Sequence, residues 1–365
     1  MTVEAFGDRA LTWFDQHGRR QLPWQQSATP YRVWVSEIML QQTQVATVIA
    51  YFERFMARFP DIAALAAASL DDVLEHWAGL GYYARARNLH STARIIRESY
   101  KGEFPHDIEA IRSLPGIGRS TAGAILALSL NQRHSILDGN VKRVLARHRG
   151  VEGWPGRPQV LHRLWQIADE LMPLLRVAHY TQAMMDLGAL ICTRRKPRCI
   201  VCPLQADCEA RRSGRQHELP APRPAKVLAV REIMMVMVRS QDDEVLLERR
   251  PPAGVWGGLL SFPEVQDEQE AVEWCERVLS APPTIIRRWP VLRHTFTHFY
   301  LNIMPLEIII NNGLGRAGED NRWVWYNDKT PCGGLAAPVK QLIKRLYYRW
   351  EGAIDDPYGT VRQAG

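Results

Sequence analysis

The sequence predicts a multidomain protein in which an all-α domain with a cysteine-rich loop precedes an α+β domain. Three observations lead to this prediction. The segments before residue 192 show helical periodicity of apolar residues, and none alternates like a strand. Four cysteines then fall within 17 residues. After a polar, proline-rich run at residues 216–224, the pattern changes to that of short strands.

The composition shift sets the expected boundaries. We expect a helical domain at residues 1–213, a linker at 214–227, an α+β domain at 228–352 and a disordered tail at 353–365. A chain of 365 residues is long enough for two hydrophobic cores. No apolar run reaches the length of a membrane span, and the first residues do not form a signal-peptide pattern. We therefore expect a cytoplasmic protein without a membrane partner.

The elements follow from periodicity and turn residues. Helices are expected at residues 2–17, 31–44 with a continuation toward 59, 63–67, 70–78, 84–99, 121–129, 140–148, 159–172 and 179–191. Strands are expected at residues 230–239, 244–248, 259–262, 284–288, 296–310 and 323–326, with helices at 268–279 and 338–350.

Charge is unevenly distributed between the two parts. Residues 1–215 contain 28 Lys and Arg against 20 Asp and Glu, whereas residues 216–365 contain 18 against 19. A basic excess confined to the helical part suits contact with a polyanion. A mildly basic soluble domain is the alternative.

A glycine turn lies in the middle of the helical part. Pro115, Gly116 and Gly118 precede a helix that opens near Ser120. Backbone N–H groups at such a turn form an anion site, which would suit a nucleic-acid phosphate. A plain turn between two helices has the same pattern.

Two carboxylates have unusual surroundings. Glu37 lies among Val35, Ile38 and Met39, so it is either a solvated residue on a helix face or an acid with a raised pKa. Asp138 precedes a predicted helix and is either a helix cap or an acid delivered near a bound phosphate.

An aromatic turn follows the predicted helix at 70–78. Glycines flank it at residues 79 and 81, and Tyr82 comes next. Such a turn could wedge into a base stack, although a tyrosine packed between helices is the more common outcome.

The cysteines form the strongest single pattern. Their spacing is C-x6-C-x2-C-x5-C, at Cys192, Cys199, Cys202 and Cys208. A tight group of this kind in an intracellular chain predicts metal rather than disulfides. The single C-x2-C pair favours an iron–sulfur cluster over zinc. The basic residues 194–198 between the first two cysteines suit a phosphate backbone. Cys275 and Cys332 are expected to be ordinary reduced thiols.

The glycine turn, the downstream aspartate and the cysteine spacing together resemble the helix-hairpin-helix DNA glycosylases of the endonuclease III superfamily. The segment 35–45, VSEIMLQQTQV, further resembles the MutY adenine DNA glycosylases, and the likeness extends from about residue 6 to 350. The resemblance implies a 4Fe-4S cluster held by the four cysteines and double-stranded DNA as the partner, bound by a monomer.

The resemblance also implies roles for the catalytic residues. Glu37 would protonate the leaving adenine, and Asp138 would stabilise the cationic sugar electrostatically or trap it covalently. Asn140 would orient the water or the sugar. Strand-cleaving members carry a lysine at the position of Ser120, so this chain would be monofunctional.

Further residues are implied to contact DNA. Gln42 and Tyr82 would fill or wedge the opened stack, Thr43 would lie beside them, and Gly116 and Gly118 would hold a phosphate. Arg20, Leu22, Trp24 and Gln182 would line the adenine pocket, although Trp24 could equally belong to the core.

The second domain resembles the nudix fold. Gly258 and Glu264 match the opening of a nudix box, but residues 272–277, VEWCER, lack the arginine and one glutamate of the metal-binding part. We therefore expect a lesion reader. In the MutY family a Phe-Ser-His loop recognises 8-oxoguanine, and here that loop would be Phe296, Thr297 and His298, unless this stretch is an ordinary strand.

The resulting expectation is an enzyme that removes adenine opposite 8-oxoguanine or guanine. Three alternatives are a glycosylase with another target such as mispaired thymine, a non-catalytic iron–sulfur DNA-binding or redox-sensing protein, and a nudix pyrophosphohydrolase with a helical appendage. Retention of both Glu37 and Asp138 opposes the second alternative, and the broken nudix box opposes the third.

Overall fold

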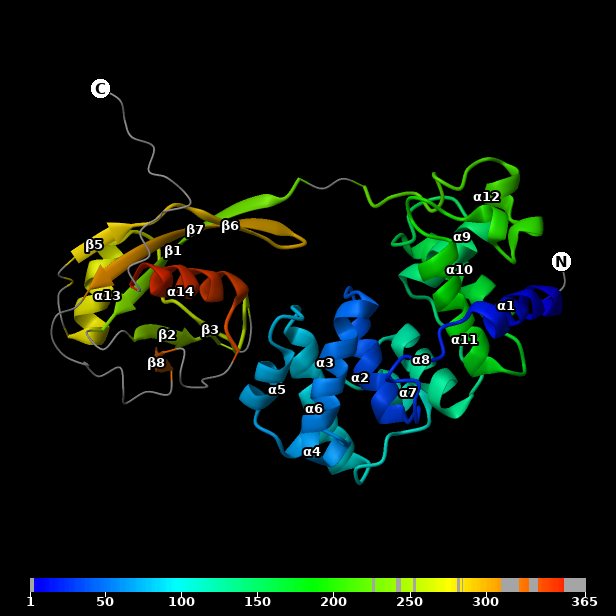
Figure 1. Ribbon diagram of the computed structural model, residues 1–365, viewed down its shortest axis with the longest axis horizontal. Coiled ribbons are helices and arrows are strands. Elements are labelled where there is room, and N and C mark those ends of the chain that lie inside the picture. Colours follow the sequence, from blue (N-terminus) through cyan, green and yellow to red (C-terminus); the bar gives the residue numbers. More distant parts are fainter. Residues whose placement is uncertain are drawn as a thin grey trace. The chain divides into compact units, whose positions relative to one another are not determined.

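The chain divides between Lys226 and Val227, inside the segment that was expected to be a linker. The computed structural model describes residues 3–224, 227–240, 244–251, 254–280, 283, 285–309, 322–327 and 334–350, and Figure 1 shows them as a helical unit and a unit built on a sheet. Among these residues no helix is long and apolar enough to cross a membrane.

The regular elements described in the first unit are all helices or helical turns. Its elements are α1 (Val3–His17), α2 (Pro30–Leu40), α3 (Val45–Arg58), α4 (Ile62–Ala67), α5 (Leu70–Trp77), α6 (Ala84–Ser99), α7 (Ile108–Arg112), α8 (Arg119–Leu130), α9 (Gly139–Arg149), α10 (Pro158–Glu170), α11 (Val177–Asp186), the π-helix η1 (Leu187–Ile191), the 3₁₀ turns η2 (Cys199–Val201) and η3 (Gln205–Asp207), and α12 (Glu209–Arg212).

Side-chain caps fix where several of these helices begin. The residue before the helix accepts a hydrogen bond from the N–H three positions on, which satisfies a donor that has no partner inside the helix. These caps are Thr29 for α2, Asp61 for α4, Ser69 for α5, Asp107 for α7 and Asp138 for α9.

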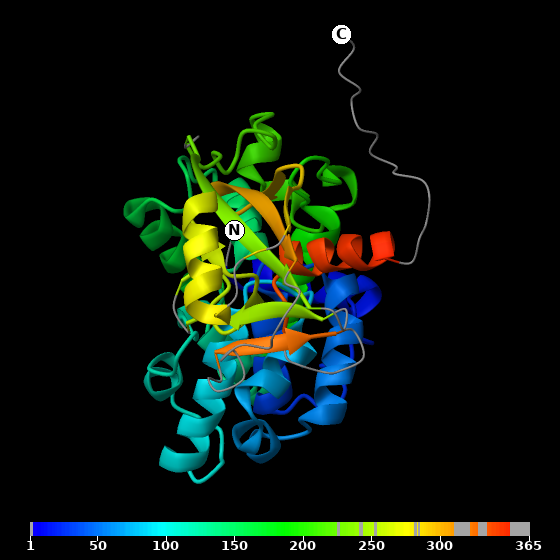
Figure 2. The same ribbon diagram turned by 90° about the vertical axis from the view of Figure 1, so that its left-hand side faces the viewer.

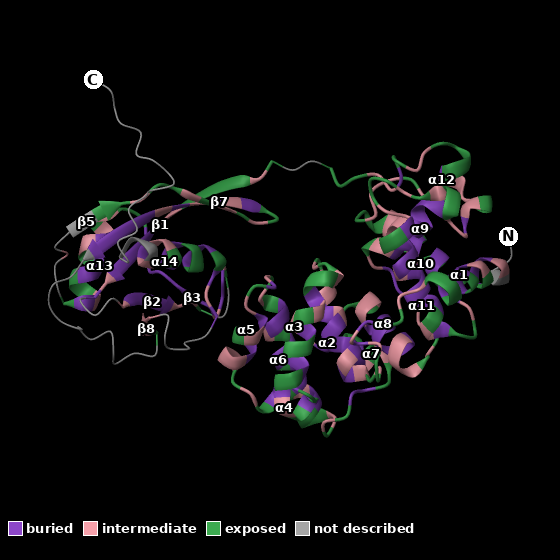
Figure 3. Cartoon of the chain, viewed as in Figure 1, coloured by how far each residue is buried: buried purple, intermediate pink, exposed green. Residues whose placement is uncertain are grey.

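Helix α8 lies at the centre of this unit. It packs against α2, α7 and α11, and its buried face consists mainly of alanines and a glycine. A core of buried apolar residues joins α1 with α8 to α11 and reaches the cysteine loop (Figure 3). The small residues of α8 therefore let several elements approach it closely.

The long helix expected at residues 31–59 is wrong, because the structure has two helices there. The chain turns at residues 41–44 between α2 and α3, and Gln42 has a φ of 60°. A non-glycine residue in that conformation interrupts a right-handed helix. Two smaller differences are α7, which was not expected, and the end of the helix expected at 179–191, which becomes η1 after Asp186.

The start of the expected linker is attached to the helical unit. Nε of Arg147 donates to the carbonyl oxygen of Leu219 at 2.7 Å, and the Leu219 side chain is buried. Arg215 pairs with Glu152 at 2.7 Å. Residues 214–219 are thus docked on α9 and its neighbourhood.

The second unit is built on one mixed sheet. Its strands are β1 (Ala229–Arg239), β2 (Val245–Arg249), β3 (Leu260–Ser261), β4 (Glu264–Val265), β5 (Ile285–Arg288), β6 (Leu292–Thr295), β7 (Phe299–Ile309) and β8 (Trp323–Tyr326). The main order is β3-β2-β1-β7-β5, in which β1 and β7 run parallel over eleven pairs of residues. β4 pairs with β1, β6 with β7, and β8 with β2.

Two helices complete this unit, α13 (Glu268–Leu279) and α14 (Ala337–Trp350), and Figure 2 shows them on opposite sides of the strands. Trp274 and Cys275 of α13 join a core with Val236 of β1 and Leu306 of β7. Alternation along β1 explains this packing, because successive side chains point to opposite faces of a sheet. The expected α+β architecture is confirmed.

The strand expected at residues 296–310 is present as β7, but it begins at Phe299, and the preceding strand β6 was not expected. β6 and β7 form an antiparallel hairpin, in which Thr295 pairs with Tyr300. The N–H of Phe296 donates to the carbonyl oxygen of Phe299 at 2.9 Å across the turn. The polar pair Thr297 and His298 occupies the tip, where both side chains are exposed. Residues 353–365, expected to form a tail, lie outside the described residues.

Candidate active site

Glu37 lies on α2, whose other residues in that region are buried. Val33, Ser36 and Ile38 are all buried, and the carboxyl group of Glu37 is surrounded by protein although part of the side chain reaches the surface. This loss of solvent raises its pKa from 4.5 to about 8, and the nearby charge of Asp138 adds to the effect. Glu37 is therefore mostly protonated near neutral pH.

Asp138 caps helix α9. One carboxylate oxygen accepts the N–H of Val141 at 2.7 Å, and the other accepts Nδ2 of Asn140 at 3.2 Å. Burial raises the pKa of this carboxyl, while these hydrogen bonds and the charge of Arg143 act in the opposite direction. The cap is thus real, and it also fixes the direction of the carboxylate.

Helix α8 brings the two carboxyl groups together. α2 packs on one side of it, and residues 132–138 run along another. A Cβ at Gly123 would lie 2.6 Å from the carbonyl oxygen of Ser135, so glycine is needed for this approach. Oγ of Ser120 then accepts the N–H of Leu137 at 2.9 Å, directly before Asp138.

A neutral acid beside a hydrogen-bonded carboxylate is a chemically useful pair. The environments of Glu37 and Asp138 differ, since Glu37 is desolvated and Asp138 receives donors. Such a difference allows one group to donate a proton while the other stabilises positive charge.

A cavity of about 290 Å³ lies in the same unit. Val33, one helical turn before Glu37, forms part of its wall, together with three of the four residues expected to line an adenine pocket. These three are Arg20, Trp24 and Gln182. Leu22 is buried nearby in the chain but does not line the cavity. Trp24 is also a core residue, packed edge-on against Phe52.

Arg19, which lines this cavity, forms an ion pair with Asp186, and the sequence did not reveal this contact. Asp186 is fully buried and accepts three hydrogen bonds from Arg19, from the backbone N–H at 2.8 Å, from Nε at 2.9 Å and from Nη2 at 2.6 Å. Asp186 also accepts Nε2 of Gln182 at 2.9 Å. Arg19 and Asp186 are 167 positions apart, so sequence patterns did not indicate this contact. The available signal was that Asp186 lies four residues after Gln182, on the same helix face.

The residues expected to enter the duplex lie on two loops of the helical unit. Gln42 and Thr43 follow α2, and Tyr82 lies between α5 and α6. Gln42 and Tyr82 are exposed and both have positive φ, 60° and 49°. Tyr82 is 46% exposed, which excludes the alternative of a fully packed tyrosine.

The glycine turn has the expected geometry for a tight connection. Gly116 has a φ of 79°, and the carbonyl oxygen of Pro115 accepts a hydrogen bond from the Thr92 hydroxyl at 3.0 Å. Gly118 caps the N-terminus of α8, and a Cβ there would meet no protein atom within 4 Å. The neighbouring Arg119 is paired with Asp169 at 2.9 Å.

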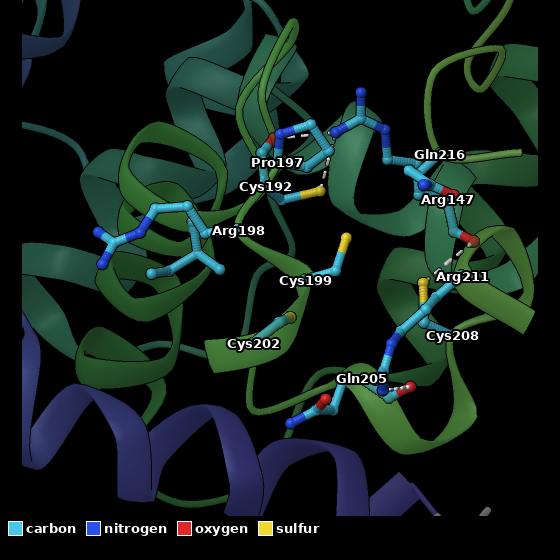
Figure 4. Close-up of a pocket in the computed structure, with 11 residues that line it drawn as sticks. Arg147, Cys192, Pro197, Arg198, Cys199, Cys202, Gln205, Cys208, Arg211 and Gln216 are labelled. Carbon is cyan, nitrogen blue, oxygen red and sulfur yellow. Dashed lines mark hydrogen bonds between the residues drawn. The ribbon is translucent and has the colours of Figure 1, made fainter. Parts of the chain in front are cut away.

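The four cysteines surround one cavity, which they share with Arg147 and Arg198 (Figure 4). No three His, Cys, Asp or Glu in the described part of the chain converge closely enough to hold a single metal ion. Zinc requires its ligands about 2.3 Å from one point, so sulfur donors spread around a cavity fit a multi-iron cluster better. Cys275 is a buried free thiol, and Cys332 lies outside the described residues.

Two arginines of α9 hold the cysteine loop. Nη1 of Arg147 donates to Sγ of Cys192 at 3.3 Å and to the carbonyl oxygen of Thr193 at 2.8 Å. Nε of Arg143 donates to the carbonyl oxygen of Cys192 at 2.6 Å, and its Nη2 donates to Oδ1 of Asn140 at 2.9 Å. Arg143 thus links Cys192 to Asn140, which itself donates a hydrogen bond to Asp138.

The second unit contributes an aromatic group at the tip of the β6–β7 hairpin. The ring of Phe296 stacks on Phe299 with 4.5 Å between centroids and contacts His294 edge-on at 4.7 Å. Trp256 packs on the same ring at 5.7 Å. Phe296 is thereby anchored, and Thr297 and His298 are presented to solvent.

The nudix-like elements do not assemble a metal site among the described residues. Glu264 of β4 is paired with Arg250 at 3.0 Å, so its charge is already compensated. Gly258 has a φ of 77° in the preceding turn. These residues serve the fold of the unit.

Comparisons with known proteins agree with this division. Residues 35–170 match the model of the HhH-GPD superfamily of base excision DNA repair proteins, and residues 234–345 match that of the NUDIX domain. In solved structures, the helical part is similar to a thermostable thymine-DNA glycosylase, with a TM-score of 0.52 and 25% identity over 58% of this chain and 97% of the other. It also shares the fold of endonuclease III in a non-covalent DNA complex, with a TM-score of 0.50 and 22% identity over 59% of this chain and 98% of the other.

Curated relatives match along nearly the whole chain. An adenine DNA glycosylase of Buchnera aphidicola is 39% identical over 95% of this chain and 99% of its own length. An adenine DNA glycosylase of Mus musculus is 32% identical over 94% of this chain and 78% of its own. With its paired carboxyl groups, its helical glycosylase fold and its nudix-like second unit, the chain belongs to the adenine DNA glycosylases.

Proposed function

We propose that this adenine DNA glycosylase removes adenine that is opposite 8-oxoguanine or guanine, and that it does so by hydrolysis without cleaving the strand. The observation that carries this proposal is the enclosed carboxyl group of Glu37 near Asp138, an environment that raises the pKa of Glu37 to about 8. The products would be free adenine and an abasic site.

The chemistry follows from the leaving group. Adenine leaves poorly as an anion, so Glu37 would donate its proton to the base as the bond from C1′ of the sugar to N9 breaks and its electrons pass to the base. The sugar becomes cationic, and Asp138 would stabilise it electrostatically or through a transient covalent bond. Water would then add at C1′, with its proton returning to a carboxylate and Asn140 orienting the water or the sugar.

The cavity supports adenine as the base. Nε2 of Gln182 is engaged by Asp186, so the carbonyl oxygen of Gln182 is the group that would accept the exocyclic amine of adenine. A base with a carbonyl oxygen in place of that amine would face the carbonyl oxygen of Gln182, and two acceptors cannot form a hydrogen bond with each other. Arg20 and Trp24 would contribute charge and an aromatic face to the same pocket.

Ser120 supports a monofunctional enzyme. A Schiff base needs an amine nucleophile, and a hydroxyl group cannot form one. Its oxygen is moreover occupied by the N–H of Leu137.

The cysteine cavity supports a 4Fe-4S cluster as cofactor. Cys192, Cys199, Cys202 and Cys208 would be its ligands, and Arg147 would compensate their negative charge. The cluster would fix the loop that carries the basic residues 194–198, which would approach the phosphate backbone.

The second unit would read the opposite base. Phe296 would provide an aromatic face, and Thr297 and His298 would provide polar contacts, from a hairpin tip that is exposed. Gln42, Thr43 and Tyr82 would enter the opened duplex, and the turn at Gly116 and Gly118 would bind a phosphate. The enzyme would act as a monomer.

Single-turnover base release tests the proposal. Duplexes would carry adenine opposite 8-oxoguanine, adenine opposite guanine, or thymine opposite guanine, each assayed with and without alkali. We expect adenine release from the first two duplexes, and we expect strand breaks only in the samples that are treated with alkali. Faster release of thymine would contradict the substrate, and strand cleavage without alkali would contradict the monofunctional mechanism.

A further inference from the structure

Two exposed residues of the helical unit have backbone conformations that are costly for side chains other than glycine. Gln42 follows α2 with a φ of 60°, and Tyr82 precedes α6 with a φ of 49°. Both side chains are exposed. Left-handed conformations of this kind are strained for residues other than glycine and persist where the surroundings enforce them.

Arg85, in the first turn of α6, contacts both loops. Its side chain is buried, with 8% of the residue exposed. Toward the first loop, Nη1 donates to the carbonyl oxygens of Ile38 at 2.8 Å, Met39 at 2.8 Å and Gln41 at 2.6 Å, and Nη2 donates to Oγ1 of Thr43 at 3.3 Å. Toward the second loop, Nη2 donates to the carbonyl oxygens of Leu80 at 3.3 Å and Gly81 at 3.1 Å. One guanidinium group therefore binds the chain on either side of Gln42 and the two residues before Tyr82.

Aromatic rings close the remaining faces of this group. The guanidinium carbon lies 5.3 Å from the centre of the Trp77 ring and 5.4 Å from that of Tyr82. Burial lowers the pKa of Arg85 to about 10, which still leaves the group charged at neutral pH. Charged donors make stronger hydrogen bonds to carbonyl oxygens than neutral ones, and the planar fork of arginine serves several acceptors at once.

We propose that Arg85 is a positioning residue that holds residues 41–43 and 80–82 as one rigid unit, so that Gln42 and Tyr82 enter the opened base stack together. The DNA role of these two side chains rests on the proposed function. The clamp itself rests on the hydrogen bonds and ring contacts of Arg85 described above, none of which involves a carboxyl group of the candidate active site.

Loss of the clamp should impair duplex opening and leave the chemistry intact. Without Arg85 each loop could relax from its left-handed conformation independently, and the two side chains would no longer be aligned. Misplacement of positioning groups by about 1 Å costs on the order of 100-fold in rate. A substrate whose target base is already unstacked should escape most of that cost.

The test compares Arg85→Lys with Arg94→Lys in the full-length protein. Lysine keeps the charge of residue 85 but cannot serve six acceptors, whereas Arg94, on the same helix, is a half-exposed residue beside Glu98. Single-turnover adenine release would be measured on a fully paired duplex with adenine opposite 8-oxoguanine, and on the same duplex with the flanking pairs mismatched. A 2-aminopurine next to the target adenine would report base extrusion.

We expect Arg85→Lys to slow release by about 10- to 100-fold on the paired duplex and by less than about 3-fold on the mismatched one, with a reduced 2-aminopurine signal. Arg94→Lys should match the wild type on both. Glu37→Gln should lose activity equally on both, because it removes the acid. Equal rates for Arg85→Lys and wild type on the paired duplex, or equal losses on both duplexes, would overturn the proposal.

Hydrogen exchange of the wild-type protein tests the clamp if Arg85→Lys does not fold. The amides of residues 41–43 and 80–82 should exchange with the same opening free energy and share one response to temperature. Independent exchange of the two segments would also overturn the proposal. Failure of the proposed function is recognised separately, since the wild type would then release no adenine from the paired duplex.

Discussion

The hydroxyl oxygen of Ser120 accepts a hydrogen bond from the N–H of Leu137 at 2.9 Å. This contact joins the first turn of α8 to the residue before Asp138. The position at which strand-cleaving members of the superfamily are expected to carry a lysine thus holds the backbone beside Asp138. Ser120 therefore has a structural function, in addition to the support that it gives to the proposed monofunctional mechanism.

Ser120→Ala should slow adenine release by about 3- to 10-fold and lower the free energy of unfolding by about 1 kcal/mol, because the Leu137 N–H loses its acceptor. The rate would be measured in single turnover and the stability by urea unfolding. Ser129→Ala is the matched control, since its hydroxyl bonds to the Ile125 carbonyl oxygen of the same helix, away from Asp138. A normal rate for Ser120→Ala would show that this contact does not position Asp138.

Gly123→Ala should displace the segment that leads to Asp138. The new Cβ would lie 2.6 Å from the Ser135 carbonyl oxygen, a distance that forces the backbone to move. We expect a loss of stability of roughly 1–3 kcal/mol and a slower single-turnover rate. In Gly7→Ala the Cβ would meet Pro173 at an ordinary 3.7 Å, so that variant should keep the wild-type rate and stability. Similar behaviour of the two variants would contradict the close packing on α8.

The rate should fall as the pH rises through the pKa of Glu37. The folded protein holds that pKa at about 8 against 4.5 for the free side chain, so the proton that adenine needs is lost above about pH 8. The pH profile of single-turnover release should therefore show a basic limb near pH 8. A rate that stays constant from pH 6 to 9.5 would mean that another group supplies the proton.

The same shift predicts a gain in stability for Glu37→Gln. A raised pKa in the folded state means that stability is lost as the pH rises from about 4.5 to about 8, because the unfolded chain releases the proton first. At pH 7 the variant avoids this cost and should unfold with a free energy roughly 1–3 kcal/mol higher than the wild type. At pH 4 the difference should vanish, and a gain that persisted there would have another cause.

The architecture was largely predictable from local patterns, whereas contacts between distant residues were not. The apolar neighbours of Glu37 left open a solvated residue or an acid with a raised pKa, and burial in the structure favours the second. The break at Gln42 was missed because apolar periodicity continues across it, and the turn at Thr297 because phenylalanines flank it on both sides. The periodicity of apolar residues does not show where the backbone turns.

The arginines that organise the helical unit were invisible for a different reason. Arg19 meets Asp186 across 167 residues, and Arg85 meets Gln41 across 44. Isolated arginines in a basic domain resemble solvated surface residues. Only the packed structure shows that they are enclosed.

Asp186→Asn should destabilise the helical unit. Its carboxylate is fully buried and receives Arg19 through three hydrogen bonds, so removal of the charge leaves a partly buried guanidinium group without compensation. We expect a loss of about 2–4 kcal/mol, measured by urea unfolding. Asp169→Asn, whose carboxylate is half exposed, should lose less than about 1 kcal/mol. Equal losses would contradict the importance of burial at Asp186.

In the proposed mechanism, Glu37 protonates the departing adenine. The most direct measurement is single-turnover release of adenine opposite 8-oxoguanine by the wild type and by Glu37→Gln, with duplex affinity determined for both. We expect the variant to bind the duplex with nearly wild-type affinity and to release no measurable adenine. Release at a rate close to that of the wild type would contradict this mechanism.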